Sequence, residues 1–175
     1  MNHYALNLTK KCQNNCLFCA FKSPPVSGYE FNSVNYKKFL YDGDIKDSII
    51  SLGGGEPTLN KDLVEIIRIF KKKNNYVELI TNGQKLSSLS YCEKLIISGI
   101  DRFCVSLHSI DKNKHNFLTN NGDSFKMTMA GILNLLRLRS KYKYDLNIVY
   151  VLNKHNLENL PKTLYFLNRF KEINI

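Results

Sequence analysis

The chain has 175 residues, 43% of them hydrophobic, which supports one substantial core but argues against a second domain. Lysine and arginine outnumber aspartate and glutamate by 25 to 15, a net charge of +10, so a basic surface is expected that could attract nucleic acid, acidic peptides or an acidic protein. No stretch approaches the ~18–20 apolar residues of a membrane span and no secretory segment is visible, so we expect one cytoplasmic domain, residues 1–175.

Strand and helix patterns alternate along the chain. The predicted strands are Tyr4–Leu8, Ser48–Leu52, Val77–Thr81, Phe103–Leu107 and Leu146–Leu152. Helices are predicted near Ser33–Tyr41, Leu59–Asn74, Leu86–Ser98, Ser124–Arg139 and Leu157–Phe170. Repeated strand–helix units predict an α/β fold with a parallel sheet, helices outside it, and a ligand site at the carboxyl ends of the strands.

Three cysteines, Cys12, Cys16 and Cys19, follow the first predicted strand. A cubane iron–sulfur cluster has four irons that each want a thiolate, so three cysteines would leave one iron open. A structural zinc site takes four ligands, and the nearest fourth candidate is His3, beyond the first strand. Five cysteines in all cannot pair completely as disulfides. The spacing therefore favours an iron–sulfur cluster and leaves zinc as the alternative.

Glycines follow the second predicted strand, in the segment Gly53-Gly54-Gly55-Glu56-Pro57. Glycine at a strand end lets a ligand approach the backbone closely, and proline stiffens the exit from the turn. The carboxylate of Glu56 supplies an acceptor for a cationic group. A glycine turn alone is weak evidence, but beside the cysteine loop it indicates a binding site.

The combination of Cys-x3-Cys-x-Phe-Cys with Gly54-Gly55-Glu56-Pro57 resembles the radical S-adenosylmethionine family. The resemblance continues through Thr81-Asn82-Gly83 and through Ser106-Leu107-His108-Ser109. It implies a partial (β/α)6 TIM-like barrel of parallel strands. It also implies two cofactors, a [4Fe–4S] cluster held by the three cysteines and S-adenosylmethionine bound through the open iron.

The resemblance implies a set of cofactor-binding residues as well. They are Phe18 toward adenine, Glu56 toward the methionyl ammonium together with Gly54, Gly55 and Pro57 of the same motif, Asn82 toward the methionyl group or the substrate, Ser106 toward ribose, and Asn153 toward the nucleoside. Strand parity puts Cys104, Ser106 and His108 on one face, so His108 could contact cofactor or substrate, relay protons, or simply be hydrogen-bonded at the strand end. Ordinary core packing for Phe18 and an ordinary Asn-Gly turn at Asn82 stay open.

The activity implied by the resemblance is reductive cleavage of S-adenosylmethionine followed by hydrogen abstraction from a substrate. An electron donor such as flavodoxin or ferredoxin is then implied. The substrate is unidentified; a peptide or cofactor precursor is favoured, and nucleic acid stays open because of the basic charge. The alternatives are a glycyl-radical-enzyme activase and a non-catalytic iron–sulfur or S-adenosylmethionine-binding module or fragment.

Several residues outside these motifs also receive predictions. Cys92 and Cys104 are expected to be inert core residues, and His115, in the polar loop Asp111–Asn116, and His155 are expected at the surface. The segment Ile173–Ile175 looks like a truncated sixth strand, which would leave the edge of Leu146–Leu152 open. We expect a longer parent chain, a partner or self-association to cover that edge.

Overall fold

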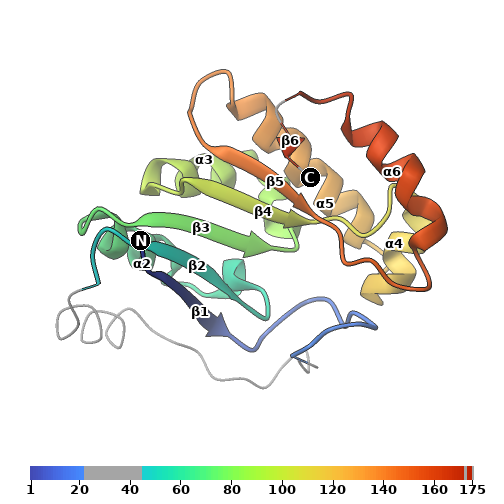
Figure 1. Cartoon of the computed structure of the whole chain (residues 1–175), viewed down its shortest axis with the longest axis horizontal. Coiled ribbons are helices and arrows are strands. Elements are labelled where there is room, and N and C mark those ends of the chain that lie inside the picture. The colour runs from blue at the N-terminus through green and yellow to red at the C-terminus, as the bar shows by residue number, and fades with distance from the viewer. Residues whose placement is uncertain (22–44, 172, 175) are drawn as a thin grey trace.

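The computed structural model describes residues 1–21, 45–171 and 173–174. Its centre is one parallel sheet whose strands follow chain order from β1 to β6 (Figure 1). The strands are β1 (His3–Thr9), β2 (Ile49–Gly54), β3 (Tyr76–Thr81), β4 (Arg102–Ser106), β5 (Asp145–Val149) and β6 (Ile173–Asn174). The predicted α/β fold with parallel strands is confirmed. The main shift is in β5, which ends at Val149 rather than at Leu152.

Most of the described helices follow a strand and begin close to the predicted position. They are η1 (Pro57–Leu59), α2 (Leu63–Lys71), η2 (Gln84–Ser87), α3 (Leu89–Ser98), α4 (Lys112–Thr119), α5 (Ser124–Leu138), η3 (Leu157–Asn159) and α6 (Leu160–Leu167). Three predicted helices each divide into a 3-10 turn and a shorter α-helix. The helix predicted near Ser33–Tyr41 lies outside the described residues. None of the described helices is long and apolar enough to cross a membrane.

The helix α4 replaces the predicted polar loop. Asp111 caps its first turn, because the carboxylate accepts a hydrogen bond from the backbone N–H of Lys114 at 2.9 Å. The buried positions of α4 are His115, Leu118 and Thr119, so two of its three buried side chains are polar. An apolar stripe of the usual kind is therefore missing, and the predictions of a loop here and of an exposed His115 are wrong.

The core lies between one face of the sheet and the helices. On β3, Val77, Leu79 and Thr81 are buried on this face, and Ile66 and Phe70 of α2 belong to the same cluster. Figure 1 shows α3 and α5 on the far side of the strands, which is the helical side. We call the opposite side the interior face; alternation along β3 gives it Tyr76, Glu78 and Ile80, among others.

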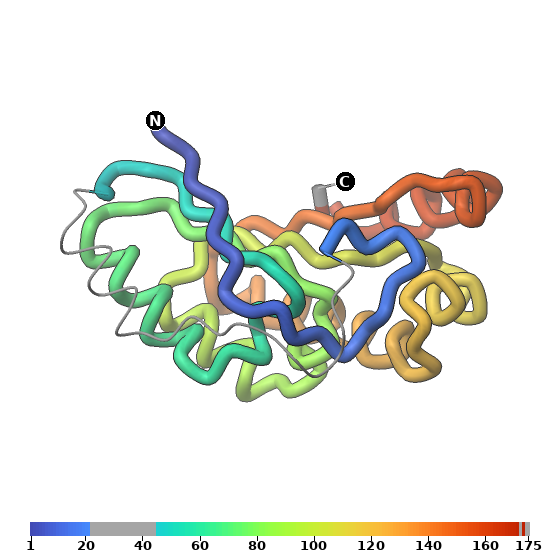
Figure 2. The backbone as a smooth tube through the Cα atoms, turned by 90° about the horizontal axis from the view of Figure 1, so that it is seen from below, coloured from blue at the N-terminus to red at the C-terminus, as the bar shows by residue number. Residues whose placement is uncertain are grey.

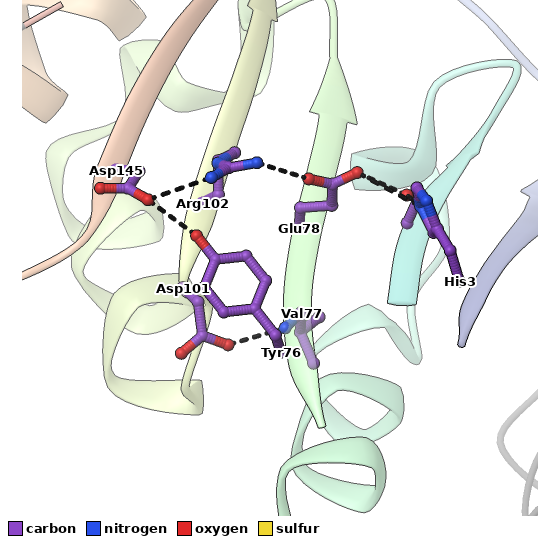
Figure 3. Close-up of polar contacts among 8 residues, drawn as sticks. His3, Tyr76, Val77, Glu78, Asp101, Arg102 and Asp145 are labelled. Carbon is purple, nitrogen blue, oxygen red and sulfur yellow. Dashed lines mark hydrogen bonds and ion pairs between the residues drawn. The ribbon is translucent and has the colours of Figure 1, made fainter. Parts of the chain in front are cut away.

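Near the starts of β3, β4 and β5 the interior face carries a chain of polar contacts (Figure 3). Arg102 reaches Glu78 on one side and Asp145 on the other, each at 3.4 Å, and the hydroxyl of Tyr76 donates to Asp145 at 2.8 Å. The hydroxyl of Ser51 donates to Glu78. We call this group the interior network; its members are His3, Ser51, Tyr76, Glu78, Arg102 and Asp145.

The strand β6 is short and pairs with only part of β5. The register joins Leu146 to Ile173 and Asn147 to Asn174, whereas β4 pairs along the whole length of β5, from Asp145 to Val149. Among the described residues, Ile148 and Val149 have no strand partner on the β6 side. The predicted sixth parallel strand is therefore present, as two residues.

Candidate functional site

A cavity of about 170 Å³ opens at the carboxyl ends of the strands. The predicted site residues in its lining are Cys12, Cys16, Phe18, Cys19, Gly54, Gly55, Asn82, Ser106 and His108. Ligand pockets typically measure ~300–1,000 Å³, so a ligand as large as S-adenosylmethionine would fill this cavity and extend past its mouth. Three predicted residues, Glu56, Pro57 and Asn153, do not line it.

The segment leading into the cysteines is held by the glycine turn after β2. The backbone N–H of Gly55 donates to the carbonyl of Thr9 at 2.7 Å, and that of Glu56 donates to the carbonyl of Lys11 at 2.7 Å. A Cβ on Gly54 would lie 2.6 Å from the Thr9 oxygen, and one on Gly55 would overlap the Lys11 oxygen. The absence of side chains at Gly54 and Gly55 thus allows the backbone of Thr9 and Lys11 to pack against this turn. The sequence had suggested another reason for the glycines, the close approach of a ligand.

The other side of the cysteine loop is attached to α4. The backbone N–H groups of Asn15 and Leu17 donate to the carbonyls of Thr119 and Leu118, each at 3.0 Å. Figure 2 shows the blue segment after β1 crossing to the yellow α4. Because four backbone hydrogen bonds hold the loop at two places, the three thiols have a defined scaffold beside the cavity.

A buried polar cluster supports the middle of the loop. The side chain of Asn14, between the first two cysteines, is buried, and its oxygen accepts hydrogen bonds from Gln84 at 2.6 Å and Asn121 at 2.9 Å. Its amide group donates to the hydroxyl of Ser124 at 3.4 Å. The motif analysis missed these residues, although the position of Asn14 inside the cysteine motif was a signal.

The three thiols are half-buried. Burial, with the neighbouring Cys12 and Cys19 thiols, raises the pKa of Cys16 to about 12, and burial also raises the pKa of Cys12. A thiol of this kind ionises at neutral pH only when a cation replaces its proton, as a metal does. Three soft sulfur donors beside one cavity therefore fit an iron–sulfur cluster that takes one iron per thiolate.

A zinc site that uses His3 does not fit. His3 lies at the start of β1, opposite the end that leads into the cysteines, and its Nε2 atom contacts Ser51 and Glu78. The zinc alternative with His3 as fourth ligand is wrong.

Glu56 lies beneath the cavity and joins two strand-end loops. Its Oε1 atom accepts hydrogen bonds from the backbone N–H of Thr58 at 3.0 Å and from the hydroxyls of Thr58 and Thr81. Its Oε2 atom accepts from the backbone N–H of Asn82 at 2.7 Å. Burial raises the pKa of this fully buried carboxyl, and the four donors oppose that rise. Only Oε2 keeps spare acceptor capacity, so any contact with a ligand ammonium has to use that atom.

Asn82 is both a turn residue and a lining residue. Gly83 follows it at φ +77°, and the Asn82 side-chain oxygen accepts from the backbone N–H of Gln84 at 3.0 Å, which is an Asx-type turn. Its amide nitrogen lies 3.9 Å from the sulfur of Cys12. Asn82 therefore forms an ordinary Asn-Gly turn and also lines the cavity, so the predicted turn and the predicted ligand contact are compatible.

His108 and His115 form a buried pair beside Phe18. The ring centroids of His108 and Phe18 are 4.6 Å apart, edge to face, and the two imidazoles stack at 5.9 Å. Burial lowers the pKa of His108 to about 3, with a contribution from His115, and lowers that of His115 to about 4. Both rings are therefore neutral at pH 7, which argues against His108 as a proton relay.

Asn153 makes local contacts rather than cavity contacts. Its side-chain oxygen accepts from the backbone N–H of His155 at 2.9 Å, and its amide group donates to the carbonyl of Val151 at 3.0 Å. The strand predicted to end at Leu152, directly before Asn153, stops at Val149, so Asn153 lies in the following turn rather than at the end of a strand. The fully buried residue of this turn is Asn156, whose amide group donates to the carbonyls of Val151 and His108. Sequence reasoning missed Asn156.

Cys92 and Cys104 are buried and lie outside the cavity lining. Burial raises the pKa of Cys92 to about 12 and that of Cys104 to about 11. Cys92 belongs to the hydrophobic core cluster, whereas Cys104 is on the interior face between Arg102 and Ser106. Both cysteines are buried, as predicted; that they have no role in the site stays a prediction.

Comparison with known proteins gives one family and several relatives. The model of the Radical SAM superfamily matches residues 6–167. A Methanocaldococcus jannaschii protein named as a glycyl-radical enzyme activating enzyme is 28% identical over 163 residues, which are 93% of this chain and 62% of the relative. A Saccharolobus islandicus protein named as a GTP 3′,8-cyclase is 32% identical over 166 residues, which are 90% of this chain and 50% of the relative. The chain thus spans about half to three-fifths of these relatives.

Solved structures share the fold. The AdoMet-bound structure of anSMEcpe has a TM-score of 0.74 at 18% identity and is matched over 99% of this chain and 50% of that one. Streptococcus suis SuiB bound to S-adenosylmethionine has a TM-score of 0.78 at 19% identity, over 97% of this chain and 38% of SuiB. At these identities the likeness establishes the architecture, a partial barrel of parallel strands.

Proposed function

This chain belongs to the radical SAM superfamily, an enzyme class that uses a [4Fe–4S] cluster and S-adenosylmethionine, and we propose that it cleaves S-adenosylmethionine reductively and abstracts hydrogen from a substrate. The observation that carries the proposal is the convergence of Cys12, Cys16 and Cys19 on one cavity at the carboxyl ends of parallel strands. The cluster would supply the electron for cleavage when it is bound there.

The proposed work of the chain's own residues is to bind and orient. The three cysteines would each hold one iron, and the glycine turn after β2 would keep their loop in place. Glu56 is fully buried and does not line the cavity, so its Oε2 would accept a hydrogen bond from the ammonium group of S-adenosylmethionine once the turn that covers it shifts; such a charge-assisted bond is strong in a dry site. Ser106 would contact ribose. Phe18 and the neighbouring strand-end loops would exclude water from the reacting atoms.

A peptide or a cofactor precursor is the substrate class we favour. The support is indirect: solved structures with the same fold include anSMEcpe with a Kp18Cys peptide and SuiB with its precursor peptide SuiA, and a curated relative is named for a reaction of GTP. The second candidate is a glycyl-radical-enzyme activase, favoured by the 28% identity to the Methanocaldococcus jannaschii relative. A non-catalytic cluster-binding or S-adenosylmethionine-binding module is the third.

The proposed partners follow from the electron requirement and from the sheet edge. An acidic electron donor such as flavodoxin or ferredoxin, in a reducing cytoplasm, would suit the net charge of +10. We also propose that residues 1–175 act as one domain. A further segment, a partner or a second copy would cover the part of β5 that β6 leaves exposed, since an open strand edge invites pairing.

Anaerobic reconstitution followed by reduction with dithionite tests the proposed function. The expected result is about four irons and four sulfides per chain and release of methionine and 5′-deoxyadenosine from S-adenosylmethionine. Cleavage without a substrate would separate the enzyme from the non-catalytic module, which would take up iron but release no methionine. Stoichiometric zinc with no iron uptake would contradict the proposal.

A further inference from the structure

The sulfur of Cys12 has two N–H groups beside it. The backbone N–H of Asn14 donates to this sulfur at 3.4 Å, and the side-chain amide nitrogen of Asn82 lies 3.9 Å from it. N–H···S contacts are longer than N–H···O contacts because sulfur is the larger atom. The first donor belongs to the cysteine loop itself. The second follows the end of β3, so a side chain distant in sequence is directed at one of the three thiols.

The direction in which the Asn82 amide points follows from its other partners. Its Oδ1 atom accepts from the backbone N–H of Gln84 at 3.0 Å, and because a backbone N–H can only donate, the side-chain atom that faces it has to be the oxygen. The side-chain amide of Gln13 donates to the same oxygen at 3.4 Å. The other end of the carboxamide, Nδ2, is therefore the atom that faces Cys12, and it presents an N–H group to the sulfur.

The backbone of Asn82 is fixed as well as its side chain. Its N–H group donates to Oε2 of Glu56 at 2.7 Å, and its carbonyl accepts from the hydroxyl of Thr128 at 2.8 Å. Asn82 thus lies between a buried carboxyl and a thiol and donates a hydrogen bond to each. A carboxamide suits this position because it supplies an acceptor for the turn and a donor for the sulfur without adding a charge.

We propose that Asn82 is a positioning residue that tunes the cluster through Cys12: its N–H···S bond to this thiolate raises the reduction potential. The inference rests on the proposed function, which supplies the cluster. Reduction adds one electron from the donor protein, so the sulfur ligands become more negative and a hydrogen bond to them becomes stronger. Hydrogen bonds to the sulfurs are among the factors that set the potential of an iron–sulfur cluster. Asn82 thereby makes the cluster easier to reduce.

Two substitutions separate this role from support of the turn. Asn82→Ser keeps an oxygen that can accept from the backbone N–H of Gln84, as serine does in related turns, but it carries no amide to the sulfur. Asn82→Asp keeps the shape and the acceptor, and it places a carboxylate oxygen opposite the sulfur instead of an N–H group. Asn2→Ser and Asn2→Asp are the matched controls, because Asn2 is exposed and precedes β1, at the opposite end of that strand from the cysteines.

The measurement is the midpoint potential of the reconstituted cluster, from a redox titration followed by electron paramagnetic resonance in the absence of S-adenosylmethionine. We expect Asn82→Ser to lower the equilibrium constant for one-electron reduction about tenfold, which corresponds to a potential about 59 mV more negative, and Asn82→Asp to lower it further. Both Asn2 variants should keep the wild-type potential. A potential of Asn82→Ser equal to that of wild type at equal iron content would overturn the inference, and so would a rise in either Asn82 variant.

Failures of the two proposals give different results. If the wild-type protein takes up no iron, the proposed function fails, and this inference fails with it. If the wild-type protein holds a cluster but the Asn82 variants do not, pulsed electron paramagnetic resonance of the reduced wild-type cluster decides the question, with 15N placed only in the asparagine side-chain amides. The amide group of Asn14 is directed to Ser124, so a 15N coupling to the cluster would support the proposal for Asn82. Its absence would overturn the proposal.

Discussion

The interior face of the sheet carries charged side chains near the starts of β3, β4 and β5, and thiols with uncharged polar groups near their ends. In the interior network, Arg102 lies between Glu78 and Asp145, so each charge has an opposite charge beside it. The described residues that line the cavity include no Asp, Glu, Lys or Arg. The comparison indicates that the charged groups at one end of the strands are paired with each other, whereas the other end gathers three thiols and uncharged polar groups around a cavity.

Removing a cysteine thiol should produce the largest effect. It should affect the cavity at the carboxyl ends of the strands and leave the interior network unchanged. Replacement of Cys12, Cys16 or Cys19 by Ala is expected to abolish the cluster, because each thiolate would hold its own iron. Iron and sulfide analysis after anaerobic reconstitution measures this. Cys92→Ala and Cys104→Ala are the matched controls and should reconstitute normally; loss of the cluster in either would reassign the ligands.

Adding a side chain to the glycine turn after β2 tests whether the contact between this turn and the segment leading into the cysteines supports the cluster site. Gly55→Ala would force a Cβ into the Lys11 carbonyl and should cost roughly 3 kcal/mol of stability, the upper part of the range for overpacking. Chemical denaturation and iron content measure the change. Gly122→Ala is the control, since nothing lies within 4 Å of its Cβ position. Similar stability in the two variants would contradict the account of the turn.

The buried histidine beside the cavity should make stability depend on pH. The pKa of His115 is lowered to about 4 from 6.5, so the unfolded chain binds a proton that the folded chain does not. Its contribution is fully present above pH 6.5 and is lost as the pH falls toward 4, by about 2 kcal/mol at pH 5. Denaturation at pH 7 and pH 5 should give a smaller difference for His115→Gln than for wild type. His155→Gln, at an exposed position, should keep the wild-type difference.

The smallest effect is expected at the opposite end. Arg102→Lys keeps the charge of the interior network but loses the fork that reaches two carboxylates. Because the Arg102 side chain is 35% exposed and its contacts are long, the loss of stability should be below about 1 kcal/mol. Iron content and affinity for S-adenosylmethionine should not change. A loss of affinity in Arg102→Lys would show that the interior network influences the cavity, contrary to the comparison above.

The succession of strands and helices along the chain could be predicted from the sequence, because local alternation and turn residues determine it, whereas the motifs at Asn82 and His108 were recognised through the resemblance to a family. The three cysteines, Asn82 and His108 reached one cavity by this reasoning, since parallel strands bring their carboxyl ends together. The role of the glycine turn could not be predicted, because it depends on the carbonyl of Lys11, over forty residues away. His115 was misjudged for a related reason: a polar helix is buried only through its tertiary partners, Ser124 and His108.

The position of Glu56 has a consequence for how the rim of the cavity moves. The side chain of Glu56 ties Thr58 after β2 to Thr81 and Asn82 at the end of β3, so neither loop can open without leaving buried hydrogen-bonding atoms of Glu56 without a partner. Amide protons of these two loops should therefore exchange with solvent deuterium together, as a single cooperative unit. The segments around Val151 and Asn153 contact each other, Asn156 and His108 but not Glu56, so they would then open separately. A ligand would then enter the cavity where the segment after β5 opens, while the two loops bound by Glu56 stay closed.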